Sequence, residues 1–259
     1  MAWNDITWSC PPADWPLADG EVHVWAFPIQ GTDGALYKFQ EVLAQSELER
    51  AGRFRFERDR SRFVTGRAQL RHILSSYLQV EPGEIAFSYG SKGKPLLQST
   101  GALSGLMFNL AHSQDLAVLA ITRTQAVGVD IEKIRSMPNA DDLVSRFFSS
   151  AEAATFRHLP DSVRAAAFFN LWTRKEAWLK ATGEGIGGGL DQVEVSFLPG
   201  EPARFLTLGQ ADTRAADWGL YEITPAAGFT GAVAVPATQA KIECWRWTKT
   251  PSSETAIGN

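Results

Sequence analysis

The first residues that could carry chemistry are two carboxylates spaced two apart in a short apolar segment. In residues 127–132, VGVDIE, the apolar side chains alternate with Gly128, Asp130 and Glu132, so a β-strand would place these three on one face. Residues two apart in a strand lie about 6 to 7 Å from each other at their Cα atoms, close enough for two carboxylates to hold one divalent cation. We expect Gly128 to leave room for a ligand beside them. The same pattern is also typical of a solvated strand face.

The second group of candidate residues lies on a predicted helix over residues 162–182. At 100° per residue, Trp172 belongs to the apolar side of this helix, Lys175 projects within that side, and Glu176 lies at its edge. Lys180 follows Glu176 by one turn. Charged groups are therefore directed at a packed surface, as they would be in a functional site. An ordinary surface ion pair between Glu176 and Lys180 fits the same spacing, because lysine stems readily cover apolar surface.

Cationic side chains gather in two further segments of an otherwise acidic chain. An arginine-rich block occupies residues 50–62, and a loop with the sequence GSKGKP at 90–95 precedes FNLAHS at 108–113. Such cations predict a polyanionic ligand, for instance a phosphorylated cofactor. A solvated helix surface explains most of the arginines as well, and His112 also fits a core histidine bonded to a backbone carbonyl. The arginines of the block are Arg50, Arg53, Arg55, Arg58, Arg60 and Arg62.

Two common kinds of reaction centre are missing from the sequence. It contains neither GxxxxGK[ST] nor GxGxxG, the usual cradles for nucleotides. The remaining residues do not form a Ser/His/Asp or Cys/His arrangement that would supply a nucleophile. A transfer reaction would therefore take its nucleophile from the substrate.

Length and composition limit the class of protein. The chain has 259 residues, 9 Trp and 15 Phe, enough to bury a large core, which excludes disordered, collagen-like and disulfide-scaffold proteins. The formal net charge of −4 disfavours nucleic acid as a partner. Cys10 and Cys244 lack CxxC spacing and predict a reducing cytoplasm. The start of the chain has no leader pattern and no apolar run is long enough for a bilayer, so we expect a protein that is neither exported nor membrane-inserted.

The elements that position these residues recur along the chain. Each half reads as a strand, a helical region and further strands, which predicts an α+β fold of two similar α/β subdomains related by a pseudo-twofold axis. We expect an N-terminal subdomain over 1–123, a C-terminal subdomain over 124–250 and a flexible tail over 251–259. The individual predictions are strands at 21–27, 108–113, 116–122 and 126–134, helices over 46–78 with a break near 57–59, helices over 141–159 and 162–182, a stop at Gly183, and strands thereafter.

Four segments, taken in order, identify a family. They are GKP at 93–95, FNLAHS at 108–113, GVDIEK at 128–133 and WTRKEAWLKATGEG at 172–185. Together they resemble the 4′-phosphopantetheinyl transferases, specifically the larger single-chain Sfp-type members. The resemblance covers residues 50 to 185, and the first forty and last seventy residues carry no diagnostic motif. It implies the two-subdomain pseudo-symmetric fold, and a monomer because one chain supplies both walls of the cleft.

The resemblance also implies the reaction. Coenzyme A would bind between the halves, and its 4′-phosphopantetheine arm would be moved to a serine of an acyl or peptidyl carrier protein of fatty-acid, polyketide or nonribosomal-peptide synthesis. The product released is adenosine 3′,5′-bisphosphate. This is the activity of a Mg²⁺-dependent holo-acyl-carrier-protein synthase. A catalytically silent module that binds coenzyme A or a carrier protein is the alternative, and a metal-dependent phosphohydrolase is a third hypothesis.

Carried onto this sequence, the family's metal site falls on Asp130, Glu132 and Glu176, which would hold Mg²⁺, or Mn²⁺, against the pyrophosphate. Lys180 would contact the phosphate that is attacked. Glu176 is the first choice for the base that removes the serine proton, with a water held by the cation as the alternative. Lys175, together with Trp172, would build the helix and orient the site.

The cofactor contacts implied by the resemblance come from the first half of the chain. Arg50, Lys94 and His112 would bind the 3′-phosphate and adenine side of coenzyme A. Ala111 stands where the family commonly has serine, which we interpret as a modest change in a second contact to the cofactor. Further residues expected to shape this pocket are Lys92, Pro95, Asn109 and Ser113, with Arg53 and Arg62 as lesser candidates.

Overall fold

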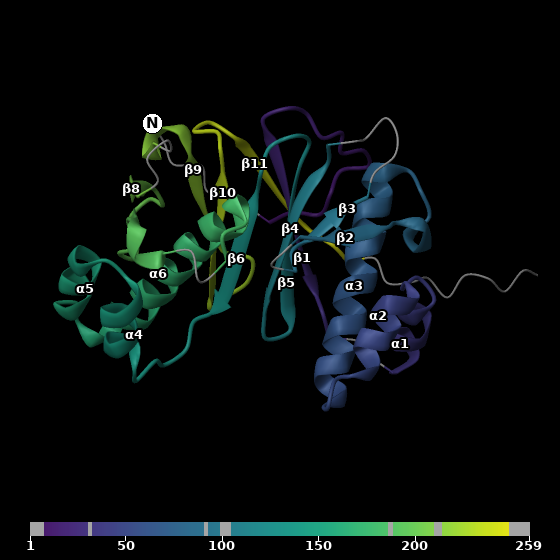
Figure 1. Ribbon diagram of the computed structural model, residues 1–259, viewed down its shortest axis with the longest axis horizontal. Coiled ribbons are helices and arrows are strands. Elements are labelled where there is room, and N and C mark those ends of the chain that lie inside the picture. The colour runs from purple at the N-terminus through teal and green to yellow at the C-terminus, as the bar shows by residue number, and fades with distance from the viewer. Residues whose placement is uncertain are drawn as a thin grey trace, which may run out of the picture.

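The chain adopts the α+β fold that the sequence predicts. The computed structural model describes residues 8–30, 33–90, 93–98, 105–185, 189–209 and 214–248. Helices α1 to α3 lie on one side of the molecule, α4 to α6 lie on the other, and the strands of the two larger sheets stand between them (Figure 1). The predicted flexible tail, 251–259, falls outside the described residues. None of the described helices combines the length and the apolar character that crossing a bilayer requires.

The first half begins with the strand that the alternation of 21–27 predicts. The predicted pair of strands at 108–113 and 116–122 is confirmed as the antiparallel hairpin β4–β5. The helical region breaks slightly before the predicted position, because Glu57 and Asp59 stand in the first turn of α3, where carboxylates stabilise the positive end of a helix. The elements are β1 (Glu21–Pro28), α1 (Asp33–Gln40), α2 (Gln45–Gly52), α3 (Glu57–Leu78), a 3₁₀ turn (Pro82–Glu84), β2 (Phe87–Tyr89), β3 (Pro95–Leu97), β4 (Met107–Ser113) and β5 (Leu116–Thr122).

The second half repeats this order of elements. The helix predicted over 141–159 is two helices, because Ser149 caps the second one by accepting from the backbone N–H of Glu152 while the Glu152 carboxylate accepts from Ser149. The stop at Gly183 is confirmed, with φ at 79°. The elements are β6 (Gly128–Lys133), α4 (Ala140–Phe147), α5 (Ser150–Arg157), α6 (Asp161–Thr182), β7 (Val193–Val195), β8 (Phe205–Leu208), β9 (Gly219–Ile223), β10 (Phe229–Val235) and β11 (Lys241–Arg246), with 3₁₀ turns at Leu190–Gln192 and Ala215–Asp217.

Two sheets carry the core. Four strands pair in the order β11-β1-β5-β4 and three in the order β6-β10-β9, so β4 and β6 are edge strands of separate sheets. β11 lies within the predicted C-terminal unit 124–250 but pairs in parallel with β1. The boundaries of the two units stay a prediction.

The alternation of faces predicted for β6 is confirmed by the core cluster that its apolar side chains enter. Val127, Val129 and Ile131 belong to a core cluster shared with β1, β5 and β10, and each is at most 1% exposed. The other face of β6 therefore turns toward α6, which packs along β6 and β10. This face carries Asp130.

The expectation that Gly128 leaves room for a ligand is wrong. A Cβ atom at Gly128 would lie 1.9 Å from the carbonyl oxygen of Ala177 and 2.4 Å from the backbone nitrogen of Ala181. The backbone of α6 fills the space, because only a residue without a side chain lets a helix approach a strand so closely. Gly128 thus brings α6 onto β6.

His23 makes the stability of the first sheet dependent on pH. Its ring is buried in β1 with Nδ1 2.8 Å from the hydroxyl of Tyr77, and burial lowers the pKa of His23 to about 4. The unfolded chain binds the proton near pH 6.5, so this contribution to stability is complete above pH 6.5 and is lost as the pH falls through that value toward 4.

We expect the H23Q variant to lose most of this dependence, roughly 3 kcal/mol between pH 6.5 and 4, in unfolding free energies measured by urea titration. An unchanged slope in H23Q would contradict the assignment.

Candidate active site

The crossing of β6 and α6 brings together the two groups of charged residues that the sequence singles out. Lys180 Nζ donates to Asp130 Oδ1 at 2.6 Å, and Asp130 is only 7% exposed. Glu176, one turn before Lys180, is 5% exposed. Asp130 therefore does not lie on a solvated strand face, which was the alternative for the carboxylate pair. Glu176 is also too buried to form the surface ion pair with Lys180 that was the alternative for the helix. The charges point into one buried junction.

Both buried carboxylates have an oxygen without a hydrogen bond. Within the described part of the chain, Asp130 Oδ2 and Glu176 Oε1 have no donor. Burial raises the pKa of Asp130 to about 6, although the ammonium of Lys180 lowers it. Burial, and then the charge of Asp130, raises the pKa of Glu176 to about 6. Two desolvated carboxylates with free oxygens are a donor set that a divalent cation suits.

Glu132, the third residue expected at the metal, is bonded to other residues. Its Oε2 accepts from Ser113 Oγ at 2.7 Å and from Arg135 Nη1 at 3.2 Å. The described residues contain no group of three or more His, Cys, Asp or Glu side chains that is already arranged to hold a metal ion. The metal set of Asp130, Glu132 and Glu176 therefore stays a prediction, for which the two unbonded oxygens are the observed basis.

Alternate residues of β4 join the two sheets at this junction. Asn109 Oδ1 accepts from the backbone nitrogen of Val129 at 2.9 Å, and Ser113 Oγ accepts from that of Lys133 at 3.1 Å. Ala111 lies between them, 4% exposed, in the apolar core that the two sheets share. Side chains thus replace the missing backbone ladder between β4 and β6. The methyl group of Ala111 is suited to this position, since a buried hydroxyl would need a partner.

Lys94 lies at the same junction, but backbone groups hold its ammonium. Its Nζ donates to the carbonyl of Lys180 at 2.5 Å and lies 3.5 Å from that of Val127. Burial and the charge of Lys180 lower the pKa of Lys94. Pro95 follows as the first residue of β3. The predicted residue Lys92 lies outside the described residues.

His112 and Arg62 lie at the border of the site. His112 is exposed at the end of β4, and its pKa is lowered first by partial burial and then by Lys180 and Arg62. Arg62 Nη2 lies 2.7 Å from Asp115 Oδ1, so its charge is already paired. This ion pair holds Arg62 of α3 beside the turn between β4 and β5, next to the strand end that carries His112.

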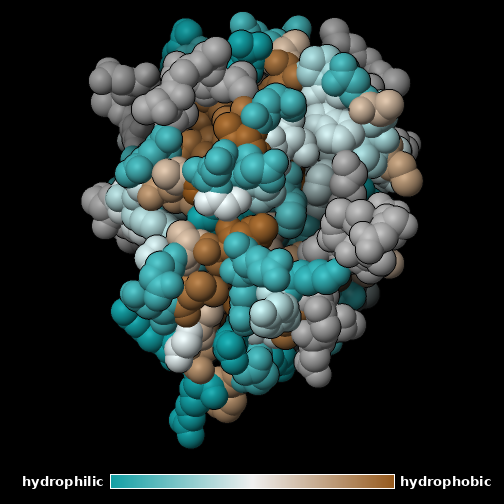
Figure 2. Space-filling model, turned by 90° about the vertical axis from the view of Figure 1, so that its right-hand side faces the viewer, coloured by the Kyte–Doolittle hydropathy of each residue, from teal (hydrophilic) through white to brown (hydrophobic). Residues whose placement is uncertain are grey.

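The other arginines of the block belong to α2, to α3 and to the segment between them, on the side of the molecule that Figure 2 shows, where hydrophilic side chains are mixed with apolar patches. Arg58 and Arg60 pair with neighbouring carboxylates in the manner of a solvated helix. Arg50 is exposed with its guanidinium 5.1 Å from the centre of the Phe63 ring. Arg53, also exposed, is the C-cap residue of α2. Neither Arg50 nor Arg53 forms an ion pair with a described residue, and Asp130 is paired with Lys180.

Two ion pairs that sequence reasoning missed anchor α6, each through a buried cation of the helix. Lys175 Nζ bonds to Glu152 of α5 and, at 2.7 Å, to the carbonyl of Leu190. Arg174 Nη2 lies 2.5 Å from Glu222 Oε2 on β9. The spacing of Ser149 and Glu152 signals a helix cap, but nothing in the sequence points to partners so distant along the chain. These bonds set the position of the helix segment that carries Glu176.

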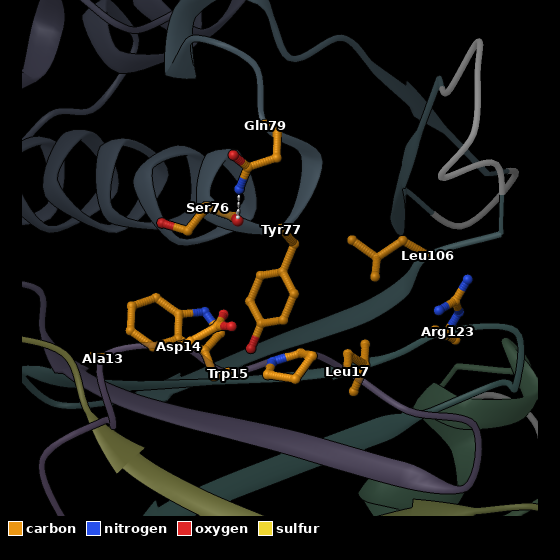
Figure 3. Close-up of a pocket in the computed structure, with 10 residues that line it drawn as sticks. Ala13, Asp14, Trp15, Leu17, Ser76, Tyr77, Gln79, Leu106 and Arg123 are labelled. Carbon is orange, nitrogen blue, oxygen red and sulfur yellow. Dashed lines mark hydrogen bonds between the residues drawn. The ribbon is translucent and has the colours of Figure 1, made fainter.

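A pocket of about 480 Å³ lies away from this junction, between residues 13–17 and the C-terminal end of α3. Figure 3 shows the Tyr77 ring reaching from α3 toward Trp15, with Leu106 and Arg123 along one side. None of the predicted site residues within the described ranges lines this pocket. The predicted charged residues Asp130, Glu176 and Lys180 lie instead at the crossing of β6 and α6.

Comparisons with known proteins agree with the resemblance. Residues 126–233 match the sequence model of the 4′-phosphopantetheinyl transferase superfamily, and residues 30–124 match that of the N-terminal region of 4′-phosphopantetheinyl transferase. The chain is 41% identical over 241 residues to the 4′-phosphopantetheinyl transferase HetI of Nostoc sp., an alignment that covers 93% of this chain and 98% of the relative.

Two further relatives align over shorter stretches. A putative 4′-phosphopantetheinyl transferase, slr0495 of Synechocystis sp., is 37% identical over 171 residues, which cover 66% of this chain and 68% of the relative. The 4′-phosphopantetheinyl transferase psf-1 of Bacillus pumilus is 36% identical over 167 residues, which cover 64% and 66%. The chain therefore belongs to the 4′-phosphopantetheinyl transferase superfamily.

Proposed function

We propose that this chain transfers the 4′-phosphopantetheine arm of coenzyme A to a serine of an acyl or peptidyl carrier protein with the help of Mg²⁺. The observation that carries the proposal is the pair of buried carboxylates, Asp130 and Glu176, each with an unbonded oxygen, of which Asp130 also accepts from the ammonium of Lys180. A module that only bound coenzyme A would not need this costly arrangement. The family membership supports the same reaction.

The reaction requires a proton acceptor and positive charge at one place. The serine oxygen attacks the phosphorus attached to the pantetheine arm, the bond from that phosphorus to the pyrophosphate bridge breaks, and its electron pair leaves with adenosine 3′,5′-bisphosphate. We assign Glu176 Oε1 as the acceptor of the serine proton, because it is buried and unbonded. Lys180 neutralises charge on the attacked phosphate.

The carboxylates that would hold Mg²⁺ are Asp130 and Glu176, joined by Glu132 if it leaves Ser113 and Arg135. When bound, the cation would neutralise phosphate oxygens. The other roles belong to protein side chains. Asp130 Oδ1 accepts from Lys180 Nζ at 2.6 Å and so holds the ammonium in place. Asn109 and Ser113 keep β6 against β4.

Intact mass spectrometry of an apo carrier protein tests the proposal. The protein is incubated with coenzyme A and this enzyme, with Mg²⁺ and again with a chelator. We expect a mass gain of one 4′-phosphopantetheine group only when the metal is present. Binding of coenzyme A without any gain, across acyl and peptidyl carriers, would instead identify a silent binding module. Release of free phosphate without a carrier would identify a phosphohydrolase.

The exposed cations of the first half are proposed to recognise the 3′-phosphate of coenzyme A. Arg50 and Arg53 are suited because their charges are unpaired among the described residues, whereas Arg62 is paired with Asp115. We expect R50A to raise the KM for coenzyme A about tenfold with little change in kcat, since a charge-assisted bond to phosphate contributes ground-state affinity.

The measurement compares coenzyme A with 3′-dephospho-coenzyme A, for which R50A and the wild type should not differ. R60A, which removes an exposed arginine paired with Glu57, is the matched control. If R50A raised the KM equally for both substrates, Arg50 would not be a residue of the 3′-phosphate site.

We further propose that the chain forms two subdomains related by a pseudo-twofold axis and works as a monomer. The repeated order of elements supports this, as do the 22-residue helices α3 and α6 and the two family models, which meet at residues 124–126. Carriers of fatty-acid, polyketide and nonribosomal-peptide synthesis are the proposed partners. The free thiols of Cys10 and Cys244 support a reducing cytoplasm.

A further inference from the structure

Lys94 is bonded far from its own hairpin. It lies just before Pro95, the first residue of β3, yet its ammonium donates at 2.5 Å to the carbonyl of Lys180 at the end of α6. The carbonyl of Val127, immediately before β6, lies 3.5 Å from the same nitrogen. One side chain from the first half of the fold therefore contacts both elements that build the candidate active site.

The carbonyl of Lys180 lies in the last turn of α6, where carbonyl groups lack a backbone donor within the helix. α6 ends at Thr182, and the last four carbonyls of a helix have no intrahelical donor. The backbone N–H groups of Gly183 and Glu184 both return to the carbonyl of Leu179, one residue before Lys180. The ammonium of Lys94 fills the role of a helix cap, and a positive charge also stabilises the negative end of the helix dipole.

The capped residue is the one whose side chain faces the reaction. Lys180 accepts from Lys94 through its backbone and donates to Asp130 through its side chain. Val127 precedes Gly128, the residue against which the α6 backbone packs. A displacement of the last turn of α6 would consequently move the ammonium of Lys180 away from Asp130.

We propose that Lys94 is a positioning residue, which caps α6 and thereby holds Lys180 against Asp130, and that it does not bind a phosphate of coenzyme A. This inference rests on the proposed function for its kinetic consequence. The capping itself is independent of the reaction. The two parts are therefore tested by different measurements.

The kinetic test uses K94M, which keeps the length of the side chain and removes the ammonium. We expect kcat to fall about tenfold, because small displacements of a catalytic group are costly. The fall should be equal with coenzyme A and 3′-dephospho-coenzyme A, and the KM for coenzyme A should stay within about twofold of the wild type. K94R, which keeps a cationic donor, should recover part of the rate. The variant R50A should show the opposite signature, a change in KM that depends on the 3′-phosphate.

The second test is hydrogen exchange of the peptide that covers 179–185, which needs no activity. We expect exchange about tenfold faster in K94M than in the wild type, with β1 unchanged. A rise in KM that disappears with 3′-dephospho-coenzyme A, or unchanged exchange at the end of α6, would overturn the proposal. If no wild-type transfer is found but exchange still responds, the cap stands and the proposed function fails.

Discussion

The variants D130N and E176Q are each expected to slow transfer by about three orders of magnitude while leaving the fold intact. Both changes keep the size of the side chain and remove a buried charge at the crossing of β6 and α6. In D130N the ammonium of Lys180 loses its 2.6 Å partner. In E176Q the unbonded Oε1 no longer accepts a proton. Single-turnover rates with a saturating carrier protein measure the loss.

The same variants should be more stable than the wild type when no metal is present. Burial raises the pKa of Asp130 from its ordinary value of 3.8, and that of Glu176 from 4.5, to about 6 in both cases. These shifts correspond to a preference of roughly 2 to 3 kcal/mol for the neutral form of each side chain. The folded chain therefore binds more protons than the unfolded chain between about pH 4 and 6, and its stability falls as the pH rises through this range. Neutral amides remove that cost.

Thermal unfolding at pH 7.5, with and without Mg²⁺, checks this pair of expectations. Mg²⁺ should raise the Tm of the wild type and have a smaller effect on either variant. E57Q is the control, since Glu57 is an exposed residue paired with Arg60. Wild-type transfer rates in D130N or E176Q would exclude the assigned residue from the reaction, and an unfolded variant would show that it is structural.

Periodicity was sufficient to predict which side chains share a face. The period of two in 127–132 separates Asp130 from Val129 and Ile131 because the latter two enter a core formed by both sheets. The helical period likewise places Glu176 one turn from Lys180. What brings these two faces together is not periodic. It depends on the packing of α6 on β6.

Contacts between residues far apart in the chain could not be predicted either, because they too depend on packing and leave no periodic pattern. Lys94 and Lys180 are 86 positions apart, and their bond runs from a side chain to a backbone carbonyl, which leaves no pattern in either segment. β1 and β11 pair across most of the chain, although the order of elements assigned β11 to the second half. Patterns within each segment predicted the helices and strands, and the family resemblance indicated the roles of the site residues. The contacts that set the geometry of the site are seen only in the structure.

Gly128 should be intolerant of even a single methyl group. In G128A the new Cβ would lie 1.9 Å from the carbonyl oxygen of Ala177, and both contacting atoms belong to the backbone, which cannot rotate away. α6 must therefore shift, and with it Glu176 and Lys180. Because overpacking of a well-packed core typically costs 1 to 3 kcal/mol, and a backbone clash is harder to relieve, we expect a loss of about 3 kcal/mol or more in unfolding free energy.

Transfer by G128A should fall at least about a hundredfold even at temperatures where the variant stays folded, because the carboxylates and the lysine come from the two elements that are forced apart. Urea titration and single-turnover kinetics on the same preparation separate the two effects. G52A is the matched control, since a Cβ at Gly52 in α2 meets nothing within 4 Å. If G128A retained both wild-type stability and wild-type rate, the close approach of α6 to β6 would not be what positions Lys180 beside Asp130.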